Sequence, residues 1–215
     1  MEAKGINFNQ MNIFMIQMEK SIFKIRVNEA FGTGFFCIIP SPDKFKYLPV
    51  MITTNHLLKE EDIIPGKTIC IFLKNDQISK KIQIDKERNT YTNKEYDITI
   101  IEIKEHDGID GDSFLEIDKE IFYENQINFN KIAVYLLSFP NGKEASYSTG
   151  IIKGLRDNGY TFEHLCPSQK GSGGGPIINI NNNKVIGFHI GTSIRSNFNI
   201  GTLLRKPIED FNKRK

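Results

Sequence analysis

Short runs of isoleucine, valine and phenylalanine recur along the whole chain, and turn-forming residues separate them. Examples are TGFFCII at 33–39, TICIFL at 68–73 and DITIIEI at 97–103. Runs of about four to eight such residues are typical of β-strands, and no apolar period of 3.6 residues extends beyond about two helical turns. The pattern therefore predicts an all-β fold, either a barrel or a sandwich, and argues against an α/β fold.

Three segments depart from this strand pattern. Residues 9–20 and 204–213 predict short helices near the two ends of the chain, the second of which closes the fold. The polar stretch at 105–130 contains HDGIDGDS and few strand-forming residues, which predicts a linker between two β units. We therefore divide the chain into an N-terminal extension, a first β unit, a linker and a second β unit with the C-terminal helix, at 1–20, 21–104, 105–130 and 131–215.

The composition is that of an ordinary globular chain with balanced charge. Of its 215 residues, 39% are hydrophobic and 25% are charged, which argues against wholesale disorder. Lys and Arg number 28 and Asp and Glu number 26, so the net charge of +2 does not favour nucleic acid or an anionic membrane as a partner. The sequence contains no apolar stretch of about 18 residues, the length that a membrane-spanning helix needs. We expect a monomer that binds neither nucleic acid nor a membrane.

The cysteines and the first twenty residues bear on the cellular compartment. Cys37, Cys70 and Cys166 are too few and too scattered for a disulfide framework, and no Cys-x-x-Cys pair indicates zinc. The N-terminal residues lack the cationic start, apolar core and cleavage site of a secretory signal. We expect a reduced, cytoplasmic protein, and nothing in the sequence implies a metal or an organic cofactor.

Three short strings contain side chains suited to catalysis, although each also has a structural interpretation. His56 lies in the apolar string ITTNHLL at 52–58, and a lone histidine there is most often structural. Asp97 precedes the apolar string ITII, where an aspartate commonly caps a turn. The glycine string KGSGGGPII at 170–178 has the composition of a flexible hairpin loop. A phosphate-binding loop is disfavoured because a strand led by Pro176, and not a helix, follows the glycines.

Taken in chain order, His56, Asp97 and a glycine turn ending Gly174-Gly175-Pro176 resemble the trypsin-like serine peptidases. The order His, Asp, Ser is that of chymotrypsin and differs from the orders of subtilisin and the α/β-hydrolases. The string GTGFF at 32–36 looks like the Gly-x-Gly strand before the histidine, and Thr54-Asn55-His56 is similar to the family's Thr-Ala-x-His or Thr-x-x-His. The resemblance covers about residues 21–211 and implies two six-stranded antiparallel β-barrels with the active site between them.

The resemblance assigns a role to each of these residues. His56 would take the proton of an attacking hydroxyl, and the carboxylate of Asp97 would orient the imidazole and stabilise its charged form. A tetrahedral oxyanion needs donors already aimed at it, and a glycine turn lets two backbone N–H groups point into one small space. By motif position these are the N–H groups of Gly171 and Gly173.

The sequence departs from the family at the nucleophile. The family writes the turn as Gly-x-Ser-Gly-Gly-Pro or Gly-x-Ser-Gly-Ser-Pro, and alignment on the final Gly-Gly-Pro places Gly173 at the serine. Glycine has no side chain to acylate, so we expect little peptidase activity. Ser172 is the alternative nucleophile, but using it would need a one-residue bulge in the same turn. The sequence does not distinguish a natural loss of the serine from its deliberate replacement.

The string VIGFHIGT at 185–192 follows the turn and resembles the Gly-Ile-His-x-Gly strand of glutamyl endopeptidases and the Gly-x-His strand of picornavirus-type cysteine proteases. In both families this histidine lies in the S1 pocket, which implies a preference for Glu, Gln or Asp at P1, with His189 as donor and Ser168 and Thr192 as hydroxyl helpers. An acidic or amide side chain needs such donors when it leaves water. The alternative is that His189 only packs in a strand. We expect His106 and His164 at the surface.

Three functional hypotheses follow. The first is a serine endopeptidase, inactive as written, whose substrate is a protein or peptide. The second is a binding module that holds an extended peptide in the cleft by strand addition without cleaving it. The third is a small β-rich structural domain in which the motifs are accidental.

Overall fold

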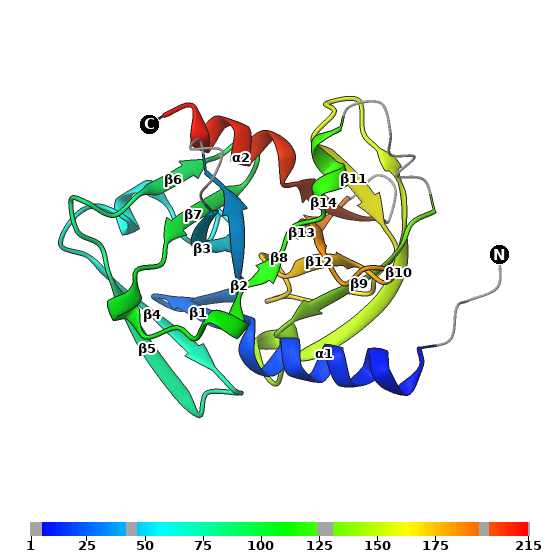
Figure 1. Cartoon of the computed structure of the whole chain (residues 1–215), viewed down its shortest axis with the longest axis horizontal. Helices are drawn as coiled ribbons and strands as arrows, with labels where there is room; N and C mark the ends of the chain where they lie inside the picture. The colour runs from blue at the N-terminus through cyan, green and yellow to red at the C-terminus, as the bar shows by residue number, and fades with distance from the viewer. Residues whose placement is uncertain (1–5, 42–46, 124–130, 194–197, 215) are drawn as a thin grey trace.

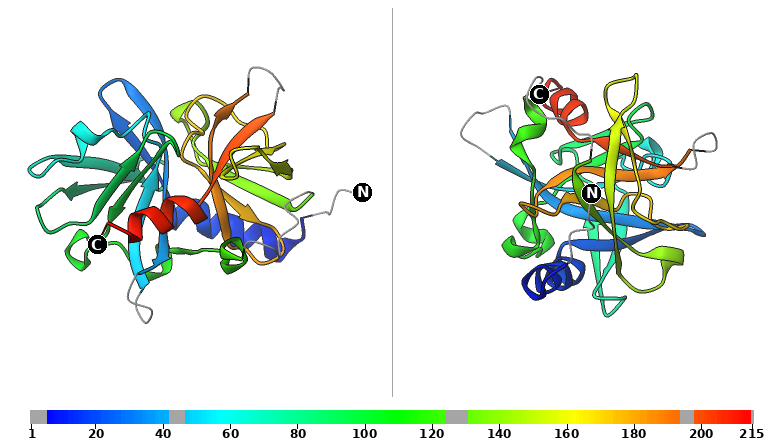
Figure 2. Two further views of the ribbon diagram at one scale, coloured as in Figure 1. Left: turned by 90° about the horizontal axis from the view of Figure 1, so that it is seen from above. Right: turned by 90° about the vertical axis from the view of Figure 1, so that its right-hand side faces the viewer.

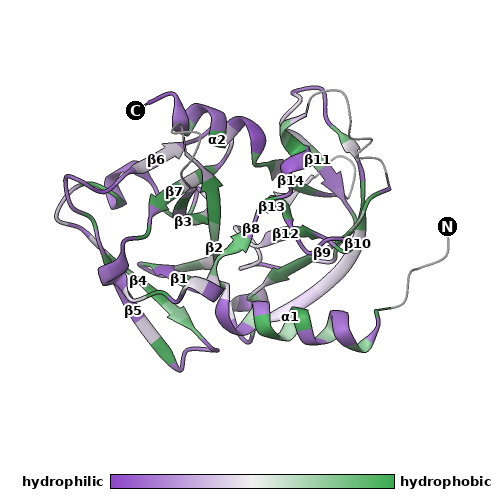
Figure 3. Cartoon of the chain, in the orientation of Figure 1, coloured by the Kyte–Doolittle hydropathy of each residue, from purple (hydrophilic) through white to green (hydrophobic). Residues whose placement is uncertain are grey.

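The computed structural model describes residues 6–41, 47–123, 131–193 and 198–214. It consists of two β units placed side by side, with a helix across each of two faces of the molecule (Figures 1 and 2). Hydrophobic residues are concentrated in the strands, and hydrophilic residues are common in the turns between them (Figure 3). In the described residues, no helix is long and apolar enough to span a membrane.

The first unit is one open, strongly curved sheet. Its strand order is β5-β4-β1-β2-β3-β7-β6, and β8 pairs with β2 outside this path. All pairs in the path are antiparallel, with Phe35 of β2 opposite Ile22 of β1 and Ile52 of β3. The strands are β1 (Ile22–Val27), β2 (Ala30–Pro40), β3 (Tyr47–Thr53), β4 (Thr68–Leu73), β5 (Ile78–Gln83), β6 (Thr90–Asn93), β7 (Ile98–Glu102) and β8 (Leu115–Glu116).

The second unit is a closed, six-stranded antiparallel barrel with the order β10-β11-β14-β13-β12-β9. Its strands are β9 (Ala133–Ser138), β10 (Ser146–Leu155), β11 (Thr161–His164), β12 (Pro176–Asn179), β13 (Val185–Thr192) and β14 (Asn199–Leu203). β9, β12 and β14 are almost completely buried. This burial matches the mainly apolar sequences of β9 and β12, whereas β14 also buries Gly201 and Thr202.

The structure corrects the expectation of two six-stranded barrels. Only the second unit closes, and the first remains a half-barrel because β5 and β6 lie at its two edges without pairing to each other. Most side chains of β5 are exposed, and β6 has only four residues. The first unit is also not wholly antiparallel, since β8 runs parallel to β2. The all-β class and the short C-terminal helix, α2 (Arg205–Asn212), agree with the sequence prediction.

Helices connect and cover the two units. α1 (Phe8–Lys20) begins with a capping box in which Asn7 and Gln10 bond to each other's backbone N–H. The segment at 105–130, predicted as a linker, contains β8 and three 3₁₀ helices, and its residues 124–130 lie outside the described part. The 3₁₀ helices in the described residues are η1 (Glu60–Asp62), η2 (Glu105–Asp107), η3 (Gly111–Ser113), η4 (Lys119–Phe122) and η5 (Pro140–Gly142).

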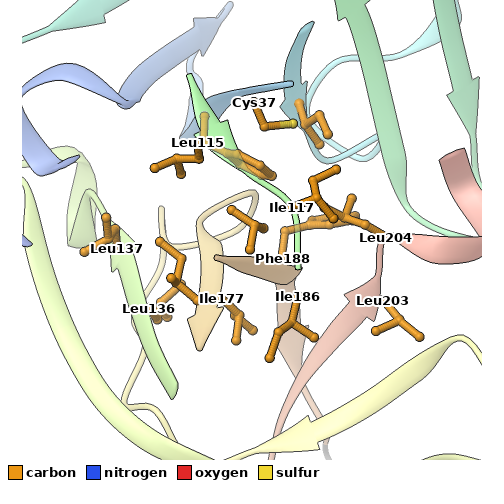
Figure 4. Close-up of a cluster of buried hydrophobic side chains, with 14 of the residues drawn as sticks. Cys37, Leu115, Ile117, Leu136, Leu137, Ile177, Ile186, Phe188, Leu203 and Leu204 are labelled. Carbon is orange, nitrogen blue, oxygen red and sulfur yellow. The ribbon is translucent and has the colours of Figure 1, made fainter. Parts of the chain in front are cut away.

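One large apolar core crosses the boundary between the units. It includes side chains of β1, β2, β3, β6 and β7, of all six barrel strands and of both α-helices, together with Leu115 and Ile117. Figure 4 shows Cys37 and Leu115 in one cluster with Ile177 and Phe188 of the barrel. A second core lies on the other face of the first sheet and includes Phe36. The two units therefore share their packing and hold each other in place.

Phe14 connects α1 to the barrel and provides a test of this shared packing. Its side chain is fully buried, with its ring 4.0 Å from the ring of Tyr135 and 5.2 Å from that of Tyr147, measured between centroids. We expect Phe14→Ala to lower the free energy of unfolding by about 3–5 kcal/mol in chemical denaturation. Phe8→Ala on the same helix is the control, because Phe8 is 78% exposed and should change stability by less than about 0.5 kcal/mol. Equal effects of both substitutions would contradict this packing account.

Candidate active site

His56 and Asp97 meet because the strands that carry them are paired. His56 follows β3, Asp97 precedes β7, and Thr53 at the end of β3 lies opposite Thr99 of β7. The Nδ1 of His56 lies 2.7 Å from Oδ2 of Asp97, and the backbone N–H of His56 donates to Oδ1 of the same carboxylate at 2.8 Å. Both carboxylate oxygens therefore hold one residue, which fixes the position and the tilt of the imidazole ring.

The loop that carries Asp97 is held by the second unit. Asp97 has a φ of 49°, a left-handed conformation that is uncommon for a residue with a side chain. Its neighbour Tyr96 donates from its hydroxyl to Asp210 of α2 at 2.7 Å, and the Tyr96 carbonyl accepts from the hydroxyl of Thr202 in β14 at 2.9 Å. The C-terminal helix and the barrel thus fix the backbone beside the carboxylate that orients His56.

The electrostatics of this pair favour the protonated imidazole. The hydrogen bond to Asp97 and the negative charge of its carboxylate raise the pKa of His56 above its ordinary value of 6.5, although partial desolvation opposes them. The side chain of His56 remains 59% exposed, so water and a ligand can reach it. In the neutral form, the proton on Nδ1 points at Asp97 and the lone pair of Nε2 is free to accept a proton.

The glycine turn packs directly against β2, the strand that contains the GTG string. The N–H of Thr33 donates to the Gly173 carbonyl at 2.9 Å, and its hydroxyl donates to the Gly171 carbonyl at 2.8 Å. A Cβ at Gly174, whose φ is 87°, would collide with the Thr33 carbonyl oxygen. A Cβ at Gly175 would collide with the Leu137 carbonyl oxygen. These two glycines are required by close backbone approach.

Gly173 differs from its neighbours because a side chain would fit there. An added Cβ would lie 3.4 Å from Cε1 and 3.5 Å from Nε2 of His56, which are ordinary van der Waals distances. Its φ lies outside the left-handed region, so no backbone strain opposes a side chain. A hydroxyl one bond farther out would be within hydrogen-bonding reach of Nε2. Glycine at this position is therefore not required by the fold.

The amides of Gly171 and Gly173 are arranged as a pair of donors. A trans peptide points its C=O and its N–H in opposite directions, and the described residues contain no cis peptide. The Lys170 carbonyl accepts from Asn141 at 2.6 Å and the Ser172 carbonyl accepts from Gly175 at 3.0 Å, so both carbonyls point into the protein. The following N–H groups, of Gly171 and Gly173, have no partner in the described part of the chain and border the cleft.

Ser172, the alternative nucleophile of the sequence analysis, points into the barrel. Its side chain is completely buried. Its Oγ accepts from the hydroxyl of Ser138 at 3.1 Å and from the backbone N–H of Gln169 at 3.2 Å. These contacts leave the hydroxyl inaccessible to a substrate, and they assign it a role in holding the turn.

A cleft of about 610 Å³ contains most of the predicted site residues. His56, Gly171, Gly173, His189 and Thr192 all line it. Ser168 does not, and it lines a neighbouring groove instead.

Ser168 and Thr192 are nevertheless joined through Asn199, a residue that the sequence analysis missed. Both hydroxyls donate to the Asn199 side-chain oxygen, at 2.9 and 2.8 Å, and the Asn199 amide nitrogen donates to the Cys166 carbonyl at 2.6 Å. Asn199 begins β14 next to residues 194–197, which lie outside the described part. No local sequence pattern distinguishes it from the other asparagines of the chain.

His189 is buried and has a histidine partner. It is 3% exposed, and its Nδ1 lies 3.2 Å from Nε2 of His164, which is completely buried. The expectation of a surface position for His164 was therefore wrong, because β11 faces the barrel interior at this residue. Burial is the main cause that lowers the pKa of His164 to about 3 and that of His189 to about 4, and repulsion from His189 and from His56, respectively, contributes to these shifts. Both rings are neutral at neutral pH.

The His56 pair makes a testable prediction about titration. We expect NMR titration to give His56 a pKa above 6.5, and Asp97→Asn to lower that pKa because only the opposing desolvation remains. Because the folded-state pKa is raised, the stabilisation from protonated His56 is present below pH 6.5 and is lost as the pH rises through the folded-state value. Glu61→Gln is the control, since its side chain is 72% exposed. An unchanged His56 pKa in Asp97→Asn would contradict the assignment.

Comparisons with known proteins agree with this geometry. Residues 32–188 match the trypsin-like peptidase domain. Among solved structures, the fold is similar to the serine endoprotease from Yersinia pestis, with a TM-score of 0.66, 12% identity and coverage of 99% of this chain and 68% of that chain.

Two structures of Rv3671c from M. tuberculosis H37Rv are also similar. A serine-to-alanine mutant in an inactive form has a TM-score of 0.67 and 16% identity, and the match covers 99% of this chain and 95% of that chain. A further inactive form of the protease has a TM-score of 0.65 and 15% identity, and the match covers 99% of this chain and 98% of that chain. A search of curated proteins gave no match. With the family match covering most of the sequence, the chain belongs to the trypsin-like peptidase family.

Proposed function

We propose that the chain has the substrate cleft, the acid–base pair and the oxyanion donors of a serine endopeptidase, and that Gly173 leaves it unable to hydrolyse peptide bonds at a useful rate. The observation that carries this proposal is the position of the missing side chain. A Cβ at residue 173 would lie 3.5 Å from Nε2 of His56 without contacting any atom closer than 3.4 Å. Only the nucleophile is lacking from an otherwise complete arrangement.

The chemistry of a serine at position 173 follows from this geometry. His56 would accept the hydroxyl proton on Nε2, and the oxygen would attack the carbonyl carbon of the scissile bond. The N–H groups of Gly171 and Gly173 would receive the developing oxyanion. With glycine, the peptide bond still meets the donors but has no hydroxyl to attack it, so the acyl-enzyme cannot form.

The cleft also supports binding of an extended peptide. β13 makes its last pair with β12 at Phe188 opposite Pro176, whereas residues 191–192 still pair with β14 on the other side. Ile190, Gly191 and Thr192 border the cleft. A strand that lacks a partner on one side can accept a peptide backbone by strand addition.

We further propose that the peptide is read at P1 by His189, as a Glu, Gln or Asp. A neutral His189 can donate into the cleft from Nε2 only if its Nδ1 accepts a hydrogen bond, and Nε2 of His164 is the group in position to donate it. His164 would then keep an acceptor nitrogen, Nδ1, which has no partner in the described residues. The buried pair thus supports a donor for an acidic or amide side chain.

The Gly173→Ser variant tests the missing nucleophile. We expect it to hydrolyse peptides at least about 10³-fold faster than the unaltered chain, because it restores the acyl-enzyme route. Gly173→Ala is the matched control, since it adds the same Cβ without the hydroxyl. Ser172→Ala in the Gly173→Ser background should keep the activity if it folds. An inactive but folded Gly173→Ser variant would contradict the proposal.

Cleavage profiling of the Gly173→Ser variant against all P1 residues tests the specificity. We expect Glu, Gln or Asp to be preferred, and we expect a second substitution, His189→Met, to lower kcat/KM for the preferred substrate by about 10- to 100-fold through loss of a buried donor. His106→Ala is the control, because the side chain of His106 is 66% exposed and outside the cleft. Preference for Lys, Arg or an aromatic residue would contradict this assignment.

A non-catalytic peptide-binding role is the second candidate function, and the intact cleft favours it. In that case the unaltered chain would bind a fluorescent peptide with Glu or Gln at P1 in an anisotropy titration, while mass spectrometry shows that the peptide stays intact. His189→Met should weaken this binding. The absence of binding at millimolar concentrations would count against this role.

A further inference from the structure

We propose that the site as it stands, with Gly173, hydrolyses activated acyl esters by using water directly as the nucleophile. This activity goes beyond peptide binding and differs from the serine route, because no covalent acyl-enzyme forms. Three observations carry it: the accessible base at His56, the space beside Gly173, and the amides of Gly171 and Gly173, which have no partner among the described residues.

The base is the Nε2 of His56. Its Nδ1 is held at 2.7 Å by Asp97, so the neutral ring carries its proton there and presents a lone pair on Nε2. Within the described residues, no protein group bonds to Nε2, and the side chain is 59% exposed. A water molecule can therefore donate to Nε2 without displacing a protein contact.

The space beside Gly173 determines where that water acts. The Cβ position of residue 173 lies 3.5 Å from Nε2, and its third neighbour, Cγ2 of Thr54, is 3.9 Å away. A water oxygen cannot sit at that Cβ point, which is one covalent bond from Cα, but at van der Waals distance in the same direction it stands close to the place that a serine hydroxyl would occupy and can donate to Nε2. It therefore faces a carbonyl carbon whose oxygen is bound by the amides of Gly171 and Gly173.

The reaction balances with water as the only co-reactant. The water oxygen bonds to the acyl carbon while one of its protons passes to Nε2 of His56, and the carbonyl oxygen becomes the oxyanion held by the two amides. The tetrahedral intermediate then expels the alcohol oxygen, which either takes up the proton from His56 or leaves as a stable phenolate, in which case His56 releases its proton to solvent water. The products are a carboxylic acid and an alcohol, and His56 returns to its neutral form.

The substrate class follows from the leaving group. A peptide nitrogen must be protonated before it leaves. Without a covalent intermediate, the water must in addition attack the peptide carbonyl carbon directly, which is slow. An aryl ester or a comparably activated acyl group has a leaving oxygen that departs without prior protonation. General-base assistance of this kind raises the rate of hydrolysis by about 10²- to 10⁴-fold, which is enough for measurable hydrolysis of such esters.

The test uses the unaltered chain and the p-nitrophenyl ester of an N-blocked amino acid. We expect His56→Ala to lower the catalysed rate by about 10²-fold or more. Gly173→Ala should lower it similarly, because its methyl group takes the water position while leaving His56 and Asp97 in place. His106→Ala is the control for attack by an exposed imidazole and should have no effect. The rate should rise with pH through the His56 pKa, without a burst of p-nitrophenolate.

Several results would overturn the inference. Equal rates for the unaltered chain and His56→Ala would exclude His56 as the general base. Full activity in Gly173→Ala would exclude the space beside residue 173 as the position of the attacking water. An acyl adduct on His56 detected by mass spectrometry would show nucleophilic attack by the imidazole instead of by water. Gly173→Ser with the same ester separates this inference from the proposed function: a p-nitrophenolate burst there, with no His56-dependent rate in the unaltered chain, refutes only the water route.

Discussion

The contact between the glycine turn and β2 determines the rest of the site. Thr33 binds the turn through its N–H and its hydroxyl, and its carbonyl lies so close to Gly174 that no side chain is possible there. The Thr33 carbonyl in turn accepts a hydrogen bond from the hydroxyl of Thr53. Thr53 is the last residue of β3, and His56 follows it closely in the chain. One backbone approach between the two β units therefore sets the distance between the imidazole and residue 173, and it leaves the amides of Gly171 and Gly173 without a partner among the described residues.

The same principle applies to Asp97, which the second unit holds through Tyr96. Because α2 and β14 fix this loop, the orientation of His56 depends on residues of both halves. The common apolar core makes such a division stable, since neither unit can move without exposing side chains of the other. The geometry of the candidate site is thus a property of the interface, and glycine at position 173 leaves that geometry intact.

Local sequence patterns predicted the parts of the fold that local physics controls. Apolar runs located most strands, and ordered motifs brought together His56, Asp97 and the glycine turn. β6, β8 and β11 do not contain such apolar runs: they are short and partly polar, so tertiary pairing and not their own sequence makes them strands. Barrel closure depends on whether the two edge strands meet, which no single run encodes. His164 and Asn199 were missed for the same reason, because their roles arise from partners far away in the sequence.

The account rests on residue 173 as the position in the described part of the chain from which a hydroxyl would reach both His56 and the oxyanion donors. Labelling with a fluorophosphonate, followed by peptide mapping, tests this most directly. The account predicts stoichiometric labelling of Gly173→Ser at position 173, dependent on His56, and no labelling of the unaltered chain. Labelling at Ser172, or a folded Gly173→Ser variant that stays unlabelled, would contradict it.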